Sequence, residues 1–393
     1  MAHESLIVSA VRTPIGSLGG VLATVPAPEL GAVCIKGALQ KAGVAPADVD
    51  EVLMGNVVSA GIGQNPARQA SIKAGLPSSV GATTVNKVCG SGLKAVMLAD
   101  QAIRLREARV VVAGGMESMS LAPYLLPCAR QGYRMGHGQL VDAMIQDGLW
   151  DVYGDAHMGT YGDQCAVKYK FTKEQQDEYA IRSYARARKA IAEGVFAEEI
   201  APVEVRLRKG TAVVNEDEEP SRFQEDKLRA LRPAFSEQGT VTAGNASSIN
   251  DGAAALVVAS EAACDKLRLK PRARVVGAAT YSLDPEWFTI APIGAIRRLL
   301  DQIGWPVDAV DLFEINEAFA NVTMAAAADL KIPIEKLNIY GGAVALGHPI
   351  GATGARILVT LLTGLKRTGG KRGVACLCIG GGEAVALAVE TVE

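Results

Sequence analysis

The feature that most constrains the fold is an internal repeat, in which residues 44–56 align with residues 304–316. Each copy runs from a helical pattern through a Pro/Asp turn into a short apolar strand that ends at an asparagine. Three pairs of landmarks are separated by the same 260 positions: Pro46 and Pro306, Asp48 and Asp308, and Asn56 and Asn316. The constant offset predicts two duplicated halves.

The two copies continue in parallel beyond this segment. Each next has a glycine-containing loop that leads into a helical pattern, with Cys89 in the first loop and His348 in the second, 259 positions apart. Each copy then closes with an apolar strand that runs into glycines, over 110–115 and 374–382. Because strands and helices alternate in both halves, we expect an α/β fold with mostly parallel sheets covered by helices.

Residues 119–248 have no counterpart in the second copy, and we interpret them as an insertion on the first half. The segment contains one clear helical pattern, introduced by a capping box at Thr172 and Gln175. The acidic run over 216–219 is typical of a solvated surface loop. Long insertions in α/β proteins often cover a site, so we expect this one to lie over functional residues.

Composition excludes several classes of protein. Hydrophobic residues make up 49% and charged residues 21% of the 393 positions, close to the globular average, which excludes disorder. The 40 Lys and Arg against 42 Asp and Glu include no basic block, so we expect no nucleic-acid partner. No uncharged apolar run approaches the roughly 18 residues of a membrane span, and we expect no membrane partner.

The cysteines and the N-terminus predict the compartment. Seven cysteines, an odd number, are scattered along the chain, which is typical of reduced thiols. The first four residues lead straight into an apolar strand without the basic region of a secretory leader. We therefore expect a cytoplasmic location.

Two residues at equivalent places in the halves are the first candidates for chemistry. Cys89 lies where a loop turns into a helix, flanked by Gly90 and Gly92, and a helix N-terminus favours the thiolate. The alternative is a buried structural cysteine. His348 occupies the matching loop, so pseudo-twofold packing would bring it toward Cys89 as a catalytic base, the alternative being a merely packed histidine.

Two further candidates lie at strand ends of the second half. Cys378 shares a strand face with Cys376 and precedes three glycines, which suits an acid/base thiol beside an oxyanion-binding Gly380 N–H. A metal is not expected, because no second pair of ligands is spaced for a closed zinc site. Asn316 either serves the site or caps the next helix, and its twin Asn56 gives the structural alternative weight. Phosphate-loop and dinucleotide-binding glycine motifs are absent from the sequence.

Five sequence blocks resemble, in order, the signature motifs of the thiolase family, over essentially the whole chain. They are residues 86–92 (NKVCGSG), 245–254 (NASSINDGAA), 316–320 (NEAFA), 347–349 (GHP) and 376–382 (CLCIGGG). The resemblance implies a layered α-β-α-β-α arrangement of the two halves with an inserted loop domain. The implied boundaries are 1–118 for the N-terminal half, completed by about 249–270, 119–248 for the inserted CoA-binding domain, and 271–393 for the C-terminal half.

The resemblance also implies a reaction, the reversible Claisen condensation of two acetyl-CoA to acetoacetyl-CoA and CoA, without a metal or redox cofactor. Cys89, deprotonated by His348, would take the acyl group as a thioester. Cys378 would remove the α-proton of the second acyl-CoA. Asn316 would hold a water that forms one oxyanion hole with His348, and the N–H groups of Cys89 and Gly380 would form the other.

CoA, acetyl-CoA and acetoacetyl-CoA are the partners that the resemblance implies. Arg222 is the candidate for stacking on adenine. The remaining implied contacts to CoA are Leu149, His157, Met158, Phe235, Ala243, Ser247, Ala318 and Phe319. The segment 157–159 (HMG) is similar to the short-chain branch of the family, which acts on acetoacetyl-CoA and is usually a homotetramer, a dimer of dimers.

Three other functions remain as alternatives. A degradative 3-ketoacyl-CoA thiolase would share the motifs and accept longer chains. A decarboxylating ketoacyl synthase would share the duplicated fold but lacks a thiol at the position of Cys378. A CoA-binding protein without catalysis would be favoured by loss of a catalytic residue, whereas Cys89, Asn316, His348 and Cys378 are all present.

Overall fold

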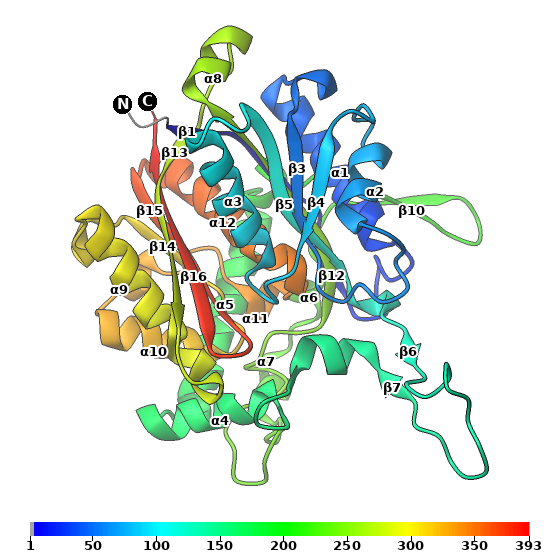
Figure 1. The fold of residues 1–393 in the computed structure, drawn as a ribbon. Helices are drawn as coiled ribbons and strands as arrows, with labels where there is room; N and C mark the ends of the chain where they lie inside the picture. Colours follow the sequence, from blue (N-terminus) through cyan, green and yellow to red (C-terminus); the bar gives the residue numbers. More distant parts are fainter. Residues whose placement is uncertain (1–3, 393) are drawn as a thin grey trace.

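The computed structural model describes residues 4–392 and is built on one large mixed sheet (Figure 1). Its strands run in the order β4-β3-β5-β12-β1-β13-β16-β15-β14, and the short β2 (Gly16–Ser17) pairs with β12. The first half supplies β1 (Ser5–Arg12), β3 (Glu51–Gly55), β4 (Gly81–Val85), β5 (Val110–Ser118) and β12 (Asn250–Ser260). The second half supplies β13 (Ala273–Ser282), β14 (Leu312–Ile315), β15 (Arg372–Ile379) and β16 (Glu383–Thr391).

Both halves follow one strand order. When the strands of each half are numbered along the chain, leaving out β2, those of the first half lie in the sheet in the order third, second, fourth, fifth, first. The four strands of the second half follow the same order with the third strand missing: second, fourth, fifth, first. Where the third strand would lie, the second half has a single parallel bridge between Leu337 and Phe313. The shared order confirms the duplicated α/β halves predicted from the repeat.

The pairing of strands differs from the sequence expectation. It is parallel between β3 and its neighbours β4 and β5, and between β14 and β15. It is antiparallel between β5 and β12, β12 and β1, β1 and β13, β13 and β16, and β16 and β15. The expectation of mostly parallel sheets is therefore wrong, because β15 and β16 form a hairpin and the long insertion returns β12 antiparallel to β5.

Helices divide the molecule into layers. Two central helices, α3 (Ser91–Arg104) and α12 (Ile350–Thr368), pack between the two parts of the sheet in one apolar core. All residues of α12 up to Leu365 are buried, as expected of a helix enclosed on every side. The outer faces are covered in the first half by α1 (Ala27–Ala42) and α2 (Pro66–Lys73), and in the second by α9 (Ala291–Ile303) and α10 (Ala320–Leu330). This gives the α-β-α-β-α arrangement.

The insertion holds more structure than the one predicted helix. The helix after Thr172 is present as α5 (Lys173–Ala192), with the capping box formed by Thr172 and Gln175. The other helices are α4 (Met158–Tyr169), α6 (Glu219–Arg222) and α7 (Glu225–Arg229). Short strand pairs are formed by β6 (Tyr124–Leu125) with β7 (Val141–Asp142), β8 (Trp150–Asp151) with β9 (Ala156–His157), and β10 (Val203–Arg206) with β11 (Thr211–Val214). The short helices α8 (Glu261–Leu267) and α11 (Ala343–Leu346) lie outside it.

The acidic run of the insertion is not a solvated loop, and that expectation is wrong. Asp217 is 2% exposed and its carboxylate binds the guanidinium of Arg12 through two hydrogen bonds of 2.7 and 2.8 Å. Glu218 accepts hydrogen bonds from the N–H groups of Ser17 and Val21. The acidic side chains thus fix the insertion to the first strand and the turn after it, because a buried cation requires a buried partner.

The sequence predicts reduced cysteines and no membrane-spanning segment. All seven cysteines are free. Within residues 4–392, no helix has the length and apolarity that a membrane crossing needs. The first three residues, which contribute to the predicted absence of a leader, lie outside the described part of the chain.

Candidate active site

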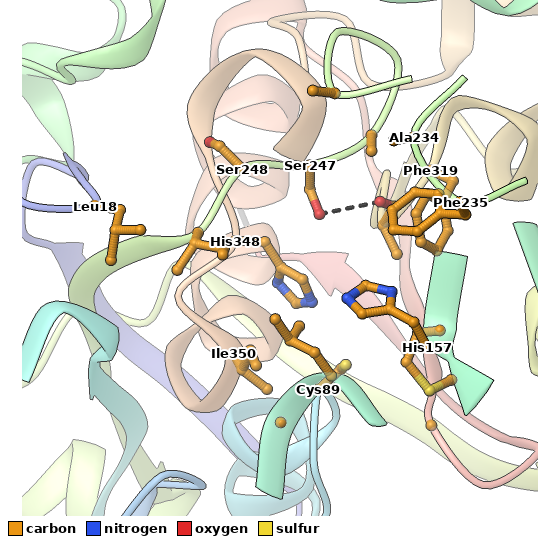
Figure 2. A pocket seen from close by; sticks show the side chains of 18 of the residues that line it. Leu18, Cys89, His157, Ala234, Phe235, Ser247, Ser248, Phe319, His348 and Ile350 are labelled. Carbon is orange, nitrogen blue, oxygen red and sulfur yellow. Dashed lines mark hydrogen bonds between the residues drawn. The ribbon is translucent and has the colours of Figure 1, made fainter. Parts of the chain in front are cut away.

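A cavity of about 500 Å³ collects side chains from both halves and from the insertion (Figure 2). Figure 2 shows the rings of His348 and His157 pointing toward each other, with Cys89 close to both. The residues predicted from the sequence that line the cavity are Cys89, Leu149, His157, Met158, Arg222, Phe235, Ala243, Ser247, Ala318, Phe319, His348 and Gly380. The other two, Asn316 and Cys378, are buried and lie outside this lining.

Cys89 is held by a strained loop between β4 and α3. Val88 has a φ of 44°, a left-handed conformation that is rare for a β-branched residue and costs on the order of 1–3 kcal/mol. The Ser91 hydroxyl fixes this turn by donating to the Val88 carbonyl at 2.6 Å. Gly90 leaves room for the opposite half, since a Cβ there would lie 2.4 Å from Cδ1 of Ile379. The strain presents Cys89 to the cavity.

The environment of Cys89 makes it a protonated thiol. Burial raises the pKa of Cys89 to about 11, while hydrogen bonds from the backbone N–H groups of Gly380 and of Cys89 itself act to lower it. Burial therefore outweighs the stabilisation expected from the helix N-terminus, and a base is needed to form the thiolate. The two N–H groups that contact the sulfur are the pair that the family resemblance assigned to an oxyanion hole.

His348 is prepared as that base by its hydrogen bonds. Its Nδ1 lies 2.6 Å from Oγ1 of Thr353, and the Thr353 hydroxyl donates to the Pro349 carbonyl at 2.8 Å. A hydroxyl has one proton, so Nδ1 must donate to Thr353 and Nε2 carries the lone pair. Nε2 is buried without a protein partner. Burial lowers the pKa of His348 to about 3, which keeps the imidazole neutral and able to accept a proton.

Asn316 and its twin Asn56 have different surroundings. The amide nitrogen of Asn56 is fixed by the Met116 carbonyl at 3.2 Å and by Oε1 of Glu117 at 2.8 Å. Both amide atoms of Asn316 are buried without a protein partner. Asn316 does not cap the following helix, whose N-cap is Phe319, so that alternative is wrong. A free buried amide is suited to binding an ordered water.

Cys378 provides a second thiol next to the first. It lies at the penultimate position of β15 and is fully buried. Burial, followed by the proximity of Cys89, raises the pKa of Cys378 well above its ordinary value. Its strand neighbour Cys376 faces an outer helix, where its thiol contacts the Pro292 carbonyl at 3.9 Å. Among the described residues, no group of three or more His, Cys, Asp or Glu side chains is arranged to hold a metal ion.

The aromatic wall of the cavity comes from the insertion and from Phe319, the residue just before α10. The rings of His157 and Phe235 stack with their centroids 4.8 Å apart, and Phe235 meets Phe319 edge to face at 6.2 Å. Nδ1 of His157 accepts a hydrogen bond from the Gly159 N–H at the start of α4. The proton of the neutral ring is therefore on Nε2, which makes that nitrogen a donor.

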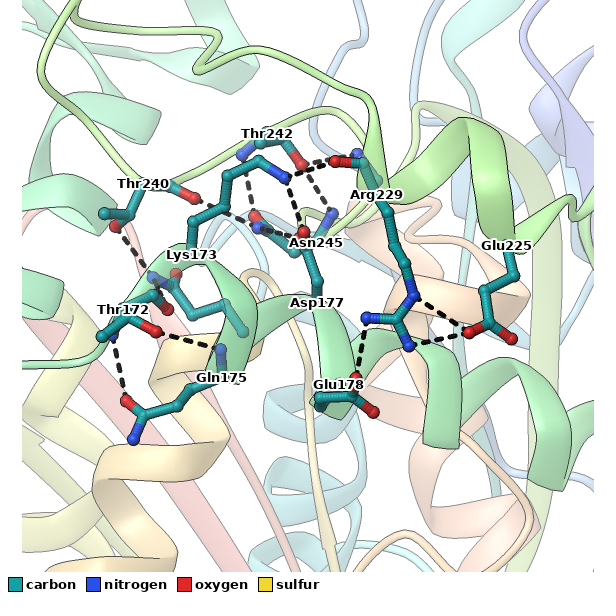
Figure 3. Close-up of polar contacts among 12 residues, drawn as sticks. Thr172, Lys173, Gln175, Asp177, Glu178, Glu225, Arg229, Thr240, Thr242 and Asn245 are labelled. Atoms are coloured by element: carbon teal, nitrogen blue, oxygen red, sulfur yellow. Dashed lines mark hydrogen bonds and ion pairs between the residues drawn. The ribbon is translucent and has the colours of Figure 1, made fainter.

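A polar network fixes the loop that carries Ala243 and Ser247 (Figure 3). Asn245 donates to the Asp177 carboxylate of α5 at 2.9 Å and to the Thr240 carbonyl at 3.1 Å. From this anchored loop, the N–H and hydroxyl of Ser247 both reach the Ala318 carbonyl at 3.0 Å. The insertion is thereby attached to the second half at the cavity wall.

Arg222 lies at the exposed side of the lining. Its guanidinium pairs with Glu218, and its side chain is 54% exposed. An exposed cation at the cavity edge is available to a phosphorylated or aromatic group of a ligand.

Several residues at the site were not predicted from the sequence. Asn250 and Glu117 act through hydrogen bonds to groups distant in the chain, and Thr353 through one to His348 five residues earlier, and none of these bonds leaves a signal in a single sequence. Thr353 and Asn250 fall within or beside the motif blocks, which is the only feature that could have pointed to them. Lining residues that were also missed are Ser17, Leu18, Val88, Gly148, Glu219, Ala234, Ala246, Ser248, Ile249, Phe288 and Ile350.

Comparison with known families gives matches across the chain. Residues 5–262 match the family described as "Thiolase, N-terminal domain", and residues 269–391 match "Thiolase, C-terminal domain". Together these matches cover nearly all of the described residues.

Curated relatives and a solved structure are similar over their full length. An acetyl-CoA acetyltransferase of Chromobacterium violaceum is 53% identical over 389 residues, which cover 98% of this chain and 99% of the relative. One from Cupriavidus necator is 54% identical, with the same coverage. The crystal structure of the Bacillus anthracis acetyl-CoA acetyltransferase superposes with a TM-score of 0.97 at 42% identity, covering 100% of this chain and 99% of that one.

Proposed function

Because this chain belongs to the thiolase family, we propose that its cavity joins two acetyl groups through an acyl-cysteine intermediate. The protein is an acyltransferase, an acetyl-CoA acetyltransferase that interconverts two acetyl-CoA with acetoacetyl-CoA and CoA. The observation that carries the mechanism is the unpartnered Nε2 of His348 in the same cavity as Cys89, with the thiol of Cys378 beside it.

In the first half-reaction, Nε2 of His348 takes the thiol proton of Cys89, and the sulfur attacks the thioester carbonyl of acetyl-CoA. The carbonyl oxygen becomes an oxyanion, which the N–H groups of Cys89 and Gly380 stabilise. The tetrahedral intermediate then expels CoA, and His348 returns the proton to the departing sulfur. The raised pKa of Cys89 explains why the step depends on this base.

In the second half-reaction, Cys378 passes its thiol proton to Nε2 of His348, and the resulting thiolate removes a proton from the acetyl carbon of a second acetyl-CoA. The negative charge moves to the thioester oxygen, where the Nε2–H of His348 and a water held by Asn316 stabilise it. The carbon attacks the acetyl group on Cys89, and the Cys89 sulfur leaves. The departing Cys89 sulfur takes the proton from Nε2 of His348, so both thiols and the neutral imidazole are restored and the cycle consumes no net proton. Thiolysis runs the same steps in reverse.

We assign the CoA-binding role to the insertion and to Ala318 and Phe319, just before α10. The donor Nε2 of His157 suits the amide oxygens of pantetheine, and Met158 and Phe319 supply apolar walls. The exposed Arg222 suits the adenine or its phosphates. The domain boundaries drawn from the sequence, with 119–248 as a CoA-binding unit, belong to this proposal.

We also propose a cytoplasmic homotetramer. Support for the assembly comes from large apolar side chains that the insertion exposes between β6 and β7: Leu126, Tyr133, Met135 and Leu140. Light scattering after gel filtration would measure the mass, and a monomer of 41.0 kDa would contradict the tetramer.

The activity is tested by CoA-dependent thiolysis of acetoacetyl-CoA beside a 3-ketoacyl-CoA about four carbons longer. Cleavage of the short substrate alone is the expected result. Equal or preferred cleavage of the longer one would make the protein a degradative thiolase of broader range. Alkylation of Cys89 by iodoacetamide, with and without acetyl-CoA, tests the intermediate, because an acetylated sulfur resists the reagent.

A further inference from the structure

A buried carboxylate, Glu117, lies between the two halves next to the active site. It is near the end of β5 and is fully buried. Its Oε2 accepts hydrogen bonds from the N–H groups of Val57 at 3.0 Å and Gly351 at 2.9 Å. Its Oε1 accepts from Nδ2 of Asn56 at 2.8 Å and from the Val58 N–H at 3.2 Å. Four donors thus surround one carboxylate.

These donors belong to segments that are distant in the chain. Val57 and Val58 follow β3 in the first half, whereas Gly351 lies in the first turn of α12, three residues after His348. Glu117 is therefore a direct polar connection between the first half and the start of the helix that follows the base. The lengths of these hydrogen bonds determine how closely the segment after β3 and the start of α12 approach each other.

The backbones at this crossing touch each other through glycines. A Cβ on Gly115 would lie 2.0 Å from the Gly351 carbonyl oxygen, and one on Gly55 would lie 2.6 Å from the same atom. A Cβ on Gly351 would lie 2.7 Å from Oε2 of Glu117. The close fit leaves the start of α12 little room to shift, and Glu117 supplies the polar part of that constraint.

Glu117 is also within electrostatic reach of the nucleophile. Burial raises the pKa of Glu117 to about 7, an effect that the N–H groups of Gly351, Val57 and Val58 oppose. Its charge in turn contributes to the raised pKa of Cys89, after burial. No part of the mechanism uses this carboxyl group as a proton donor or acceptor, and it does not line the cavity.

We propose that Glu117 is a positioning residue, which holds the first turn of α12 and with it His348 at the working distance from Cys89. The inference rests on the proposed function, because it assumes that His348 deprotonates Cys89. A small displacement of a catalytic group costs about 10²-fold in rate, which sets the expected size of the effect.

The test is Glu117→Gln, which keeps the size of the side chain but places an NH₂ group against N–H donors. Asp50→Asn is the matched control. The Asp50 carboxylate accepts from the N–H groups of Arg109 at 2.7 Å and Val110 at 3.0 Å, and so clamps the opposite end of β5. Acetylation of Cys89 is followed in a single turnover at saturating acetyl-CoA, CoA binding by calorimetry, and unfolding by heat.

We expect Glu117→Gln to slow acetylation by about 10²-fold with CoA affinity unchanged, and Asp50→Asn to leave both near wild type. Glu117→Asp retains the charge and should recover part of the rate; it also carries the test if the Gln variant fails to fold. Acetylation by Glu117→Gln, or by a folded Glu117→Asp, at the wild-type rate overturns the inference. So does an equal loss in Asp50→Asn. A wild-type protein that is never acetylated would instead refute the proposed function.

Discussion

Replacing Thr353 by valine tests how His348 is kept ready to accept a proton. Valine has nearly the shape of threonine but lacks the hydroxyl that accepts the Nδ1 proton at 2.6 Å. Because Thr353 is fully buried, the Nδ1–H group of the variant has no water to replace that acceptor. The tautomer with its proton on Nδ1 and a free Nε2 is therefore destabilised, and the tautomer with its proton on Nε2, which cannot act as a base, is favoured.

The magnitude follows from the cost of a buried donor without a partner, about 1–3 kcal/mol. This cost falls on the active tautomer alone, and each 1.4 kcal/mol corresponds to a factor of ten in rate. We therefore expect acetylation of Cys89 to slow by between about 5-fold and about 150-fold, with CoA affinity unchanged. Rapid quenching followed by intact-protein mass spectrometry measures the rate of acetylation.

Thr363→Val provides the control within the same helix. Thr363 is also buried, and its hydroxyl donates to the carbonyl four residues earlier, as that of Thr353 does, but it does not contact a histidine. The control variant should lose a similar amount of stability and keep the wild-type rate of acetylation. Equal rates in Thr353→Val and wild type, or equal losses in the two variants, would refute the tautomer argument.

Further variants test the two thiols, the buried ion pair and the base. Cys89→Ala should abolish both acyl-enzyme and turnover, and a labelled acetyl group retained on the protein would exclude Cys89 as the nucleophile. Cys378→Ser should still be acetylated but lose roughly 10²–10⁴-fold in condensation, and normal condensation would remove Cys378 from the mechanism. Asp217→Asn leaves the buried Arg12 cation poorly paired and should lower the free energy of unfolding by about 3–5 kcal/mol in urea titration; a change within error would contradict the pairing. Because burial lowers the pKa of His348 to about 3, the unfolded chain binds a proton below about pH 6.5 that the folded one does not, so stability falls with decreasing pH. His348→Asn should remove up to about 1.4 kcal/mol per pH unit of this slope below pH 6.5, and an unchanged slope would speak against the buried neutral imidazole.

The repeat made the main outline of the fold predictable. Residues separated by a constant or nearly constant offset occupy equivalent positions if both halves fold alike, so the spacing assigns Cys89 and His348, 259 positions apart, to matching loops. The capping box at Thr172 is equally local, since side chain and backbone partners lie three residues apart. Features of this kind depend on residues that are close together in the sequence, and the structure contains them where they were expected.

The direction of the strands and the burial of the acidic run depend on residues that are distant in the sequence. Strand pairing depends on which segments the long insertion brings together, and an α/β alternation does not specify that. The acidic run was misjudged because its partner, Arg12, is 205 residues away from Asp217. A charged side chain becomes buried only where a distant partner compensates the loss of water, and a single sequence does not show such partners.

The sequence by itself therefore determined the duplicated α/β halves and the residue types of the chemistry, because repeats and motifs are properties of neighbouring positions. The tertiary structure decided what those residues can do. It separates Asn316, whose amide is free, from Asn56, whose amide nitrogen is fixed by Glu117. It also places the proton of His348 through Thr353 and leaves Cys89 protonated by burial. Burial, and partners such as the Glu117 that fixes Asn56, come from segments far apart in the chain, and only the folded molecule brings those segments into contact.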